Sequence, residues 1–175
     1  SLRRQLHVLE KCGIRLRPEV RLEQLFVESP KEHLESEGFF ATVLALGSEV
    51  LDSPPKWFSD NLWHLDTECI YDGADYVNVA ERMAALACGD LPLQDIRSHV
   101  DIDGEEAWLQ FRLGNSAIRW DARVDSDWID GEILSKFARL LSTRNTVRRF
   151  TYFDLQAQDC VIGCMTPNQM KRFRK

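Results

Sequence analysis

The chain of 175 residues has no long apolar run. Its longest, from Phe39 to Leu46, is interrupted by Thr42 and falls well short of the ~20 residues that a membrane-spanning helix needs. We therefore expect no membrane partner. Arg3 and Arg4 are not followed by an apolar stretch or a small-residue cleavage site, which argues against a signal peptide. Because the chain begins with Ser1, a leader removed beforehand stays an open alternative.

The sequence also lacks the short motifs of several enzyme classes. It contains no G-x-S-x-G, P-loop, G-x-G-x-x-G or H-E-x-x-H pattern. Its nine glycines stand singly, mostly where turns are expected, and none forms a phosphate cradle. We therefore expect no cofactor, and a binding role ranks ahead of an enzymatic one.

The five cysteines are few, odd in number and widely scattered. They are Cys12, Cys69, Cys88, Cys160 and Cys164. This usage favours reduced thiols and a cytoplasmic location. Three residues separate Cys160 from Cys164, whereas a zinc knuckle or a thioredoxin-like centre has two. We therefore interpret that pair as structural.

Charge of each sign is concentrated in a different part of the chain. Residues 60–132 carry 17 acidic and 5 basic residues, a net charge of −12, whereas residues 133–175 carry a net +7. Such an acidic block repels nucleic acid and favours a cationic partner. The basic end lacks the interleaved aromatic residues suited to base stacking, so we expect no nucleic-acid partner.

The length and the 44% apolar content predict a single domain, residues 1–175, with its own hydrophobic core. Helical spacing of apolar residues and stop signals predict helices over 2–12, 76–87 and 133–141. Shorter helices are expected over 22–26 and 31–35. A last one should begin at Pro167, with Thr166 as its N-cap.

Strands are predicted in the middle and near the end of the chain. Apolar alternation between Ile96 and Val124, with turns at Asp103-Gly104 and Gly114-Asn115, indicates a three-stranded antiparallel meander. Trp108 and Trp120 are expected opposite each other on one face of that sheet. Further strands are expected over 63–70, 150–155 and 160–164. Residues 39–46 fit a buried strand or a buried helix, and their length and flanking glycines favour the strand.

Together these elements predict an α+β fold, an antiparallel β-meander sheet with several packing helices. Within it, the pattern His64-x-Asp66-x-Glu68 would place three polar side chains on one face of a strand. An imidazole with two carboxylates can bind a divalent metal or perform acid–base work. The alternatives are a solvated polar face or a contact with a partner, and we expect no metal.

Two further acidic segments precede regular structure. Residues 101–106 resemble a calcium loop, but the alternation on either side favours a hairpin turn. In the segment Asp125–Asp130, Asp130 is the expected N-cap of the following helix. Trp57 and Trp128 stand beside loops and are therefore the tryptophans best placed to anchor an interface.

The stretches 62–68, 125–130 and 154–167, together with the size, acidity and aromatic content, resemble those of small acidic bacterial immunity proteins. Immunity proteins neutralise toxins that are delivered between bacteria. The resemblance implies tight binding of a cognate toxin, a protein partner with a cationic cleft.

The expected function is therefore inhibitory binding through an acidic surface. The residues expected to contact the partner are Asp66, Glu68, Asp125, Asp127 and Trp128. One alternative is a metal-dependent enzyme that uses His64, Asp66 and Glu68. Another is a regulatory protein-binding module that acts through its basic C-terminal helix, with Lys171, Arg172, Arg174 and Lys175.

Overall fold

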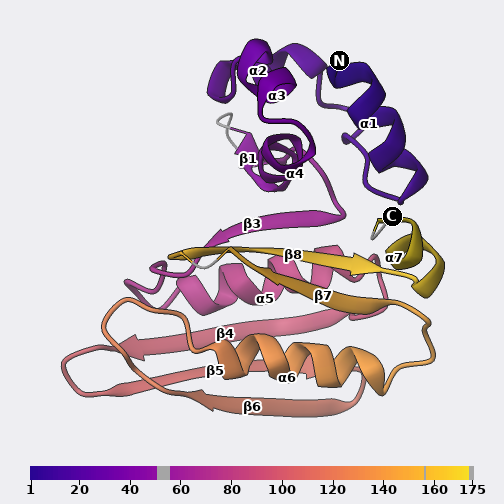
Figure 1. Cartoon of the computed structure of the whole chain (residues 1–175). Helices are drawn as coiled ribbons and strands as arrows, with labels where there is room; N and C mark the ends of the chain where they lie inside the picture. Colours follow the sequence, from indigo (N-terminus) through magenta and orange to yellow (C-terminus); the bar gives the residue numbers. More distant parts are fainter. Residues whose placement is uncertain (51–55, 156, 174–175) are drawn as a thin grey trace. The chain divides into compact units, whose positions relative to one another are not determined.

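Runs of helices and runs of strands follow one another along the chain, and consecutive strands pair antiparallel, so the fold is α+β, as the sequence predicts (Figure 1). The computed structural model describes residues 1–50, 56–155 and 157–173. The backbone divides into two units, one of Ser1–Leu65 with Arg149–Lys175 and the other of Asp66–Arg148. A single domain over residues 1–175 stays a prediction.

The second unit contains the expected β-meander. Strands β4 (Leu93–Asp101), β5 (Glu106–Leu113) and β6 (Ser116–Ala122) pair antiparallel in the order β4-β5-β6. In the first connection, the Asp101 carboxylate accepts a hydrogen bond of 2.9 Å from the Gly104 N–H. In the second, Gly114 has a φ of +61°, which glycine adopts without strain. The bond within the first connection and the pairing of β4 with β5 show that residues 101–106 form a hairpin connection.

Helices α5 (Asp75–Leu86) and α6 (Gly131–Ser142) lie on one face of this sheet (Figure 1). The ring of Phe137, from α6, lies 5.9 Å from that of Phe111 and 4.9 Å from that of Trp120. Phe111 and Phe137 are both buried. The core of the second unit therefore lies between the meander and its helices.

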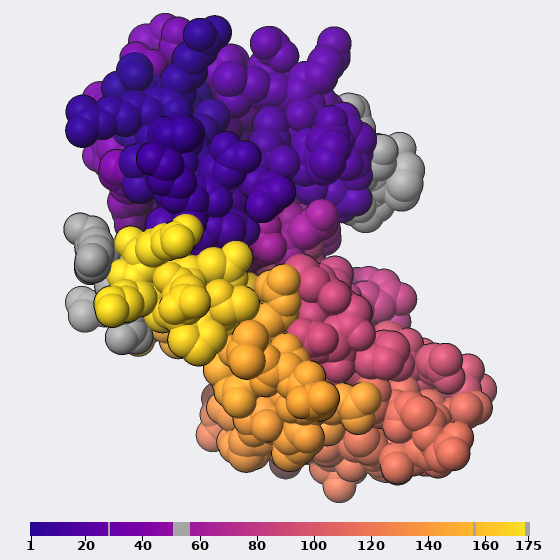
Figure 2. Space-filling model, turned by 90° about the vertical axis from the view of Figure 1, so that its right-hand side faces the viewer, coloured from indigo at the N-terminus to yellow at the C-terminus, as the bar shows by residue number. Residues whose placement is uncertain are grey.

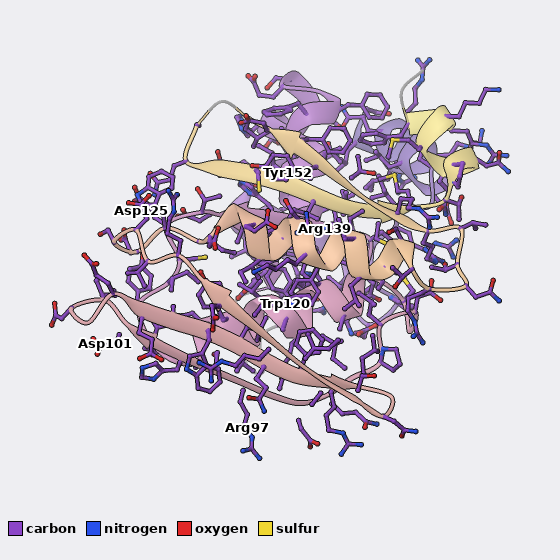
Figure 3. The ribbon with its side chains drawn as sticks, turned by 90° about the horizontal axis from the view of Figure 1, so that it is seen from below. Arg97, Asp101, Trp120, Asp125, Arg139 and Tyr152 are labelled. Atoms are coloured by element: carbon purple, nitrogen blue, oxygen red, sulfur yellow. The ribbon has the colours of Figure 1, made fainter. Side chains whose placement is uncertain are left out.

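The expected placement of Trp108 and Trp120 on one sheet face is wrong. Trp120 pairs with Leu109, whereas Trp108 pairs with Asp121, so the two tryptophans lie on opposite faces. Figure 3 shows Trp120 on the side of α6 and Arg97 on the other side. On that open side, the Trp108 ring stacks with His99, and the Arg119 guanidinium lies 4.4 Å from the Trp108 ring centre.

The first unit begins with a group of helices. Helix α1 (Leu2–Lys11) buries Leu2, Gln5 and Leu9 on one side and ends just before Gly13, which has a φ of +84°. The short helices that follow also confirm the sequence prediction. They are η1 (Leu22–Gln24), α2 (Leu25–Glu28) and α3 (Lys31–Ser36).

Residues 39–47 form helix α4 (Phe39–Gly47), so the strand predicted over 39–46 is wrong. Ala41, Ala45 and Leu46 are buried at helical spacing. Thr42 is also buried, and its hydroxyl bonds the Gln5 side chain at 2.6 Å. Alanine and leucine are strong helix formers, and the contact with α1 supplies the partner that the buried hydroxyl needs.

Two small sheets complete the first unit. Strands β1 (Glu49–Val50) and β2 (Lys56–Trp57) form an antiparallel pair. A three-stranded sheet has the order β3 (Leu62–Asp66), β8 (Asp159–Met165), β7 (Arg149–Asp154). The strands predicted near the end of the chain are thus confirmed.

Helix α7 (Pro167–Phe173) follows β8 and begins as expected. The Thr166 hydroxyl accepts from the Gln169 N–H, and the Gln169 side chain accepts from the Thr166 N–H, so each residue caps the other. Figure 2 shows the yellow C-terminal helix against the indigo N-terminal segment, where Arg172 donates to the Lys11 carbonyl at 3.1 Å. No helix within the described residues is both long and apolar enough to cross a membrane.

Candidate functional site

Strand β3 ends at Asp66, earlier than the strand predicted over residues 63–70. The Asp66 carboxylate accepts a hydrogen bond of 3.0 Å from the Glu68 N–H, which turns the chain out of the strand. The two-residue alternation that would place His64, Asp66 and Glu68 on one face therefore stops at Asp66, and that part of the prediction is wrong.

His64 instead has a partner in the first unit. Its Nε2 atom lies 2.5 Å from the Asp159 carboxylate, on the neighbouring strand β8. Across the described ranges, no group of three or more His, Cys, Asp or Glu side chains is arranged to hold a metal ion. The described geometry therefore gives no support to the metal-dependent alternative.

After the turn, residues 67–70 pair with residues 127–129. The Ile129 N–H donates to the Thr67 carbonyl at 2.8 Å, and the Ile70 N–H donates to the Asp127 carbonyl at 2.9 Å. Between these bonds, Glu68 and Trp128 face each other as an isolated antiparallel pair. This pairing brings together the two acidic segments that the sequence singled out separately.

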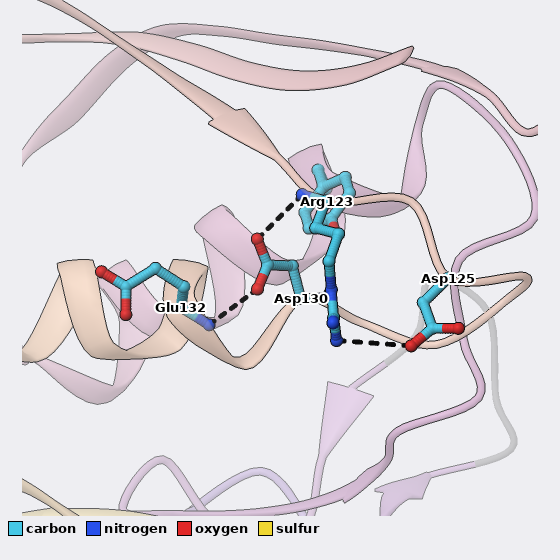
Figure 4. Close-up of polar contacts among 5 residues, drawn as sticks. Arg123, Asp125, Asp130 and Glu132 are labelled. Atoms are coloured by element: carbon cyan, nitrogen blue, oxygen red, sulfur yellow. Dashed lines mark hydrogen bonds and ion pairs between the residues drawn. The ribbon is translucent and has the colours of Figure 1, made fainter. Parts of the chain in front are cut away.

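The segment from Asp125 to Asp130 is held from both ends (Figure 4). Asp130 accepts from the Glu132 N–H at 3.0 Å as the N-cap of α6, and from the Arg123 N–H at 2.9 Å. The Arg123 guanidinium also forms a 3.3 Å ion pair with Asp125. Asp130 is therefore committed to holding the loop, as expected of a capping residue.

Within this loop, a tight turn presents the carboxylates and the indole. Ser126 has a φ of +53°, and the Trp128 N–H donates to the Asp125 carbonyl at 3.1 Å. The Trp128 side chain is 40% exposed, which is high for a tryptophan. Trp57, the other expected anchor, is half-buried in the first unit and packs edge-on against Trp63.

Tyr71 is a member of the site that the sequence did not single out. It is 65% exposed, and its hydroxyl donates to the Glu68 carbonyl at 2.7 Å. Its pKa is raised, first by desolvation and then by the negative charges of Asp127, Asp66 and Glu68. Its position between the acidic residues Asp66 and Glu68 and the Asp72-Gly73 turn was the available signal.

We call segments 66–71 and 125–128 together the acidic–aromatic ridge. All five predicted contact residues lie in it: Asp66, Glu68, Asp125, Asp127 and Trp128. It adds Tyr71 as a second exposed aromatic and contains no Lys, Arg or His. The ridge thus combines negative charge with aromatic surface, a composition suited to binding a cationic protein surface.

The surroundings of Cys160 and Cys164, both in strand β8, favour a structural role for these two cysteines over a reactive one. Cys160 and Cys164 are both buried, and all five cysteines are free thiols. Burial is the largest effect on the Cys160 thiol and raises its pKa to about 11. A buried thiol with so high a pKa is a poor nucleophile, so the structural interpretation of this pair is supported.

The basic C-terminal residues are only partly described. Lys171 and Arg172 are exposed on α7, whereas Arg174 and Lys175 lie outside the described residues.

Comparisons of the chain with known protein families, with curated proteins and with solved structures found no match.

Proposed function

We propose that this chain is an immunity-type inhibitory protein that binds and blocks a cognate bacterial toxin through the acidic–aromatic ridge. The observation that carries the proposal is the pairing of Glu68 with Trp128. It gathers four carboxylates and two exposed aromatic rings into one short stretch of surface, although the two segments are far apart in the chain.

The two kinds of side chain have separate roles in this proposal. The carboxylates of Asp66, Glu68, Asp125 and Asp127 attract a cationic cleft and speed encounter. The rings of Tyr71 and Trp128 supply most of the affinity, since interface energy concentrates in a few aromatic anchors. The backbone bonds on both sides of Trp128 hold in place, before binding, the stretch of main chain that carries the indole, which reduces the ordering cost.

The test starts from a gene beside that of this chain, where such a gene encodes a secreted toxin. The toxin domain is produced in a bacterial host with and without this protein, and growth is measured. We expect growth to be restored only when the protein is present. Toxicity that the unmodified protein leaves unchanged would remove this toxin as the partner.

The ridge itself is tested by charge reversal. Asp125→Lys with Asp127→Lys should lower the association rate with the toxin about tenfold at low salt. The matched control is Asp103→Lys with Glu105→Lys, which makes the same charge change in the exposed β4–β5 connection. Circular dichroism checks that both variants fold. An unchanged association rate, or an equal loss in both variants, would contradict the placement at the ridge.

A further inference from the structure

A separate hollow lies in the first unit, outside the ridge. It is a cavity of about 650 Å³ that opens to the surface, and its walls come from α1, α4, β7, β8 and α7. Its volume falls within the range of small-molecule sites, roughly 300–1,000 Å³.

The walls of this cavity are mainly apolar. Phe39 is 45% exposed, Phe40 is 58% exposed and Val8 is 38% exposed, and all three line it. Phe153 of β7 and Phe173 of α7 also line it, and the centres of their rings are 5.5 Å apart. Large apolar side chains gathered at an open cavity are characteristic of a binding site, whereas single exposed ones are ordinary.

The charged lining has one sign. Arg4 and Arg172 are its charged side chains, and no Asp or Glu lines it. Arg172 donates through one nitrogen to the Lys11 carbonyl, which fixes the guanidinium near the end of α1. In the part of the chain that the structure describes, no ion pair neutralises either arginine. The cavity therefore favours a ligand with a negative group.

The cavity wall has few polar side chains that could form hydrogen bonds with a ligand. The Gln5 side chain lines the cavity, but it already donates to the Leu34 carbonyl and accepts from the Thr42 hydroxyl. An extended peptide would bury backbone N–H and C=O groups against these walls without partners, at a considerable cost. An alkyl chain has no such groups and matches the walls.

We propose that the cavity binds a free amphipathic carboxylate of the fatty-acid class. The alkyl chain lies along Phe39, Phe40 and Phe153, and the carboxylate meets Arg4 and Arg172. A guanidinium offers a planar pair of donors that matches the two carboxylate oxygens. This inference does not depend on the proposed toxin partner, because it concerns other residues and another ligand.

The test compares three ligands that share one ten-carbon chain: decanoate, decan-1-ol and decyltrimethylammonium. Binding to the unmodified protein is measured by isothermal titration calorimetry below the micelle concentration. We expect saturable one-to-one binding of decanoate, weaker binding of the alcohol and the weakest binding of the cation. Equal binding of all three, or no saturable binding of decanoate, would overturn the proposal.

Variants then separate charge from apolar contact. Arg4→Gln with Arg172→Gln should weaken decanoate binding about tenfold or more, because the loss of even one charge-assisted hydrogen bond to the carboxylate has about that effect, and should leave the alcohol unchanged. The matched control, Arg3→Gln with Arg15→Gln, removes the same charge at exposed positions outside the cavity and should change nothing. Phe40→Ser, at an exposed position, should weaken all three ligands.

Other occupants are distinguished in the same series. Vesicles of phosphatidylglycerol test an anionic membrane surface, and binding to vesicles without binding to decanoate would overturn the proposal. Sedimentation over a range of concentrations tests a second copy of the chain. Self-association that Phe40→Ser abolishes and decanoate does not displace would also overturn it.

Discussion

Glu68 and Trp128 face each other as an antiparallel pair at the centre of the acidic–aromatic ridge. The flanking bonds from Ile129 to Thr67 and from Ile70 to Asp127 are backbone bonds, so the pairing does not depend on either side chain. Substitutions of the Glu68 and Trp128 side chains should therefore change binding with little effect on the fold. This separation makes the ridge accessible to mutagenesis.

The first prediction concerns Trp128. Trp128→Ala should weaken toxin binding by about 2 kcal/mol or more, mainly through faster dissociation, because an aromatic anchor that becomes buried only in the complex is lost. Surface plasmon resonance measures both rates. Tyr152→Ala, which removes an exposed ring from the first unit, is the control and should leave both rates unchanged. Equal effects of the two substitutions would argue against Trp128 as an anchor.

The second prediction concerns Asp130, which accepts bonds from both Glu132 and Arg123. Asp130→Ala should lower the free energy of unfolding by about 2 kcal/mol, since a helix cap and a second hydrogen bond are each worth about 1 kcal/mol. Asp130→Asn should lose less, because its amide oxygen still accepts. Urea denaturation measures the change, and Ser135→Ala on α6 should stay within about 0.5 kcal/mol. A loss no larger than this control would exclude the capping role.

The third prediction concerns thiol reactivity. Cys88 is exposed and Cys69 is half-buried, whereas Cys12, Cys160 and Cys164 are buried. A chromogenic disulfide reagent should therefore modify Cys88 first in the folded protein and the three buried thiols only after unfolding in urea. Cys88→Ser should remove the fast phase. A fast phase that survives this substitution would show that another thiol is accessible.

The fourth prediction concerns stability at high pH. Burial raises the pKa of the Cys160 thiol from 9.0 to about 11 in the folded chain. The folded state therefore keeps its proton at a pH where the unfolded chain releases it. This contribution to stability is complete below pH 9 and is lost as the pH rises towards 11, by about 1.4 kcal/mol per pH unit at most.

Urea denaturation between pH 9 and 11 measures this loss. Cys160→Ala should be less stable at neutral pH, because it leaves a small cavity, but its stability should fall less steeply above pH 9. Cys88→Ala, at an exposed position, should keep the slope of the unmodified protein. Identical slopes for all three proteins would show that Cys160 does not titrate with a raised pKa.

Local sequence signals were sufficient for much of the fold. The meander follows from apolar alternation and two turn signals, and α6 follows from its apolar spacing and the Asp130 cap. Signals of this kind lie within a few residues of the element that they predict, so they can be read without knowledge of the rest of the chain.

Three predictions failed, two because contacts between separate segments decide them and one because a side chain turns the backbone locally. Residues 39–47 are apolar on most sides, and the contact of Thr42 with Gln5 of α1 supports a helix in place of a strand. Strand β3 stops at the turn made by Asp66. The faces of Trp108 and Trp120 depend on the register between β5 and β6, which a one-residue shift reverses.

The candidate site shows the same division. From the sequence alone it follows that acidic residues gather in the middle of the chain, and Asp66, Glu68, Asp125, Asp127 and Trp128 are singled out there as expected contact residues. That these residues share one ridge, and that Tyr71 belongs to it, became visible in the folded chain. Backbone hydrogen bonds between residues 67–70 and 127–129 join two segments that no local pattern connects.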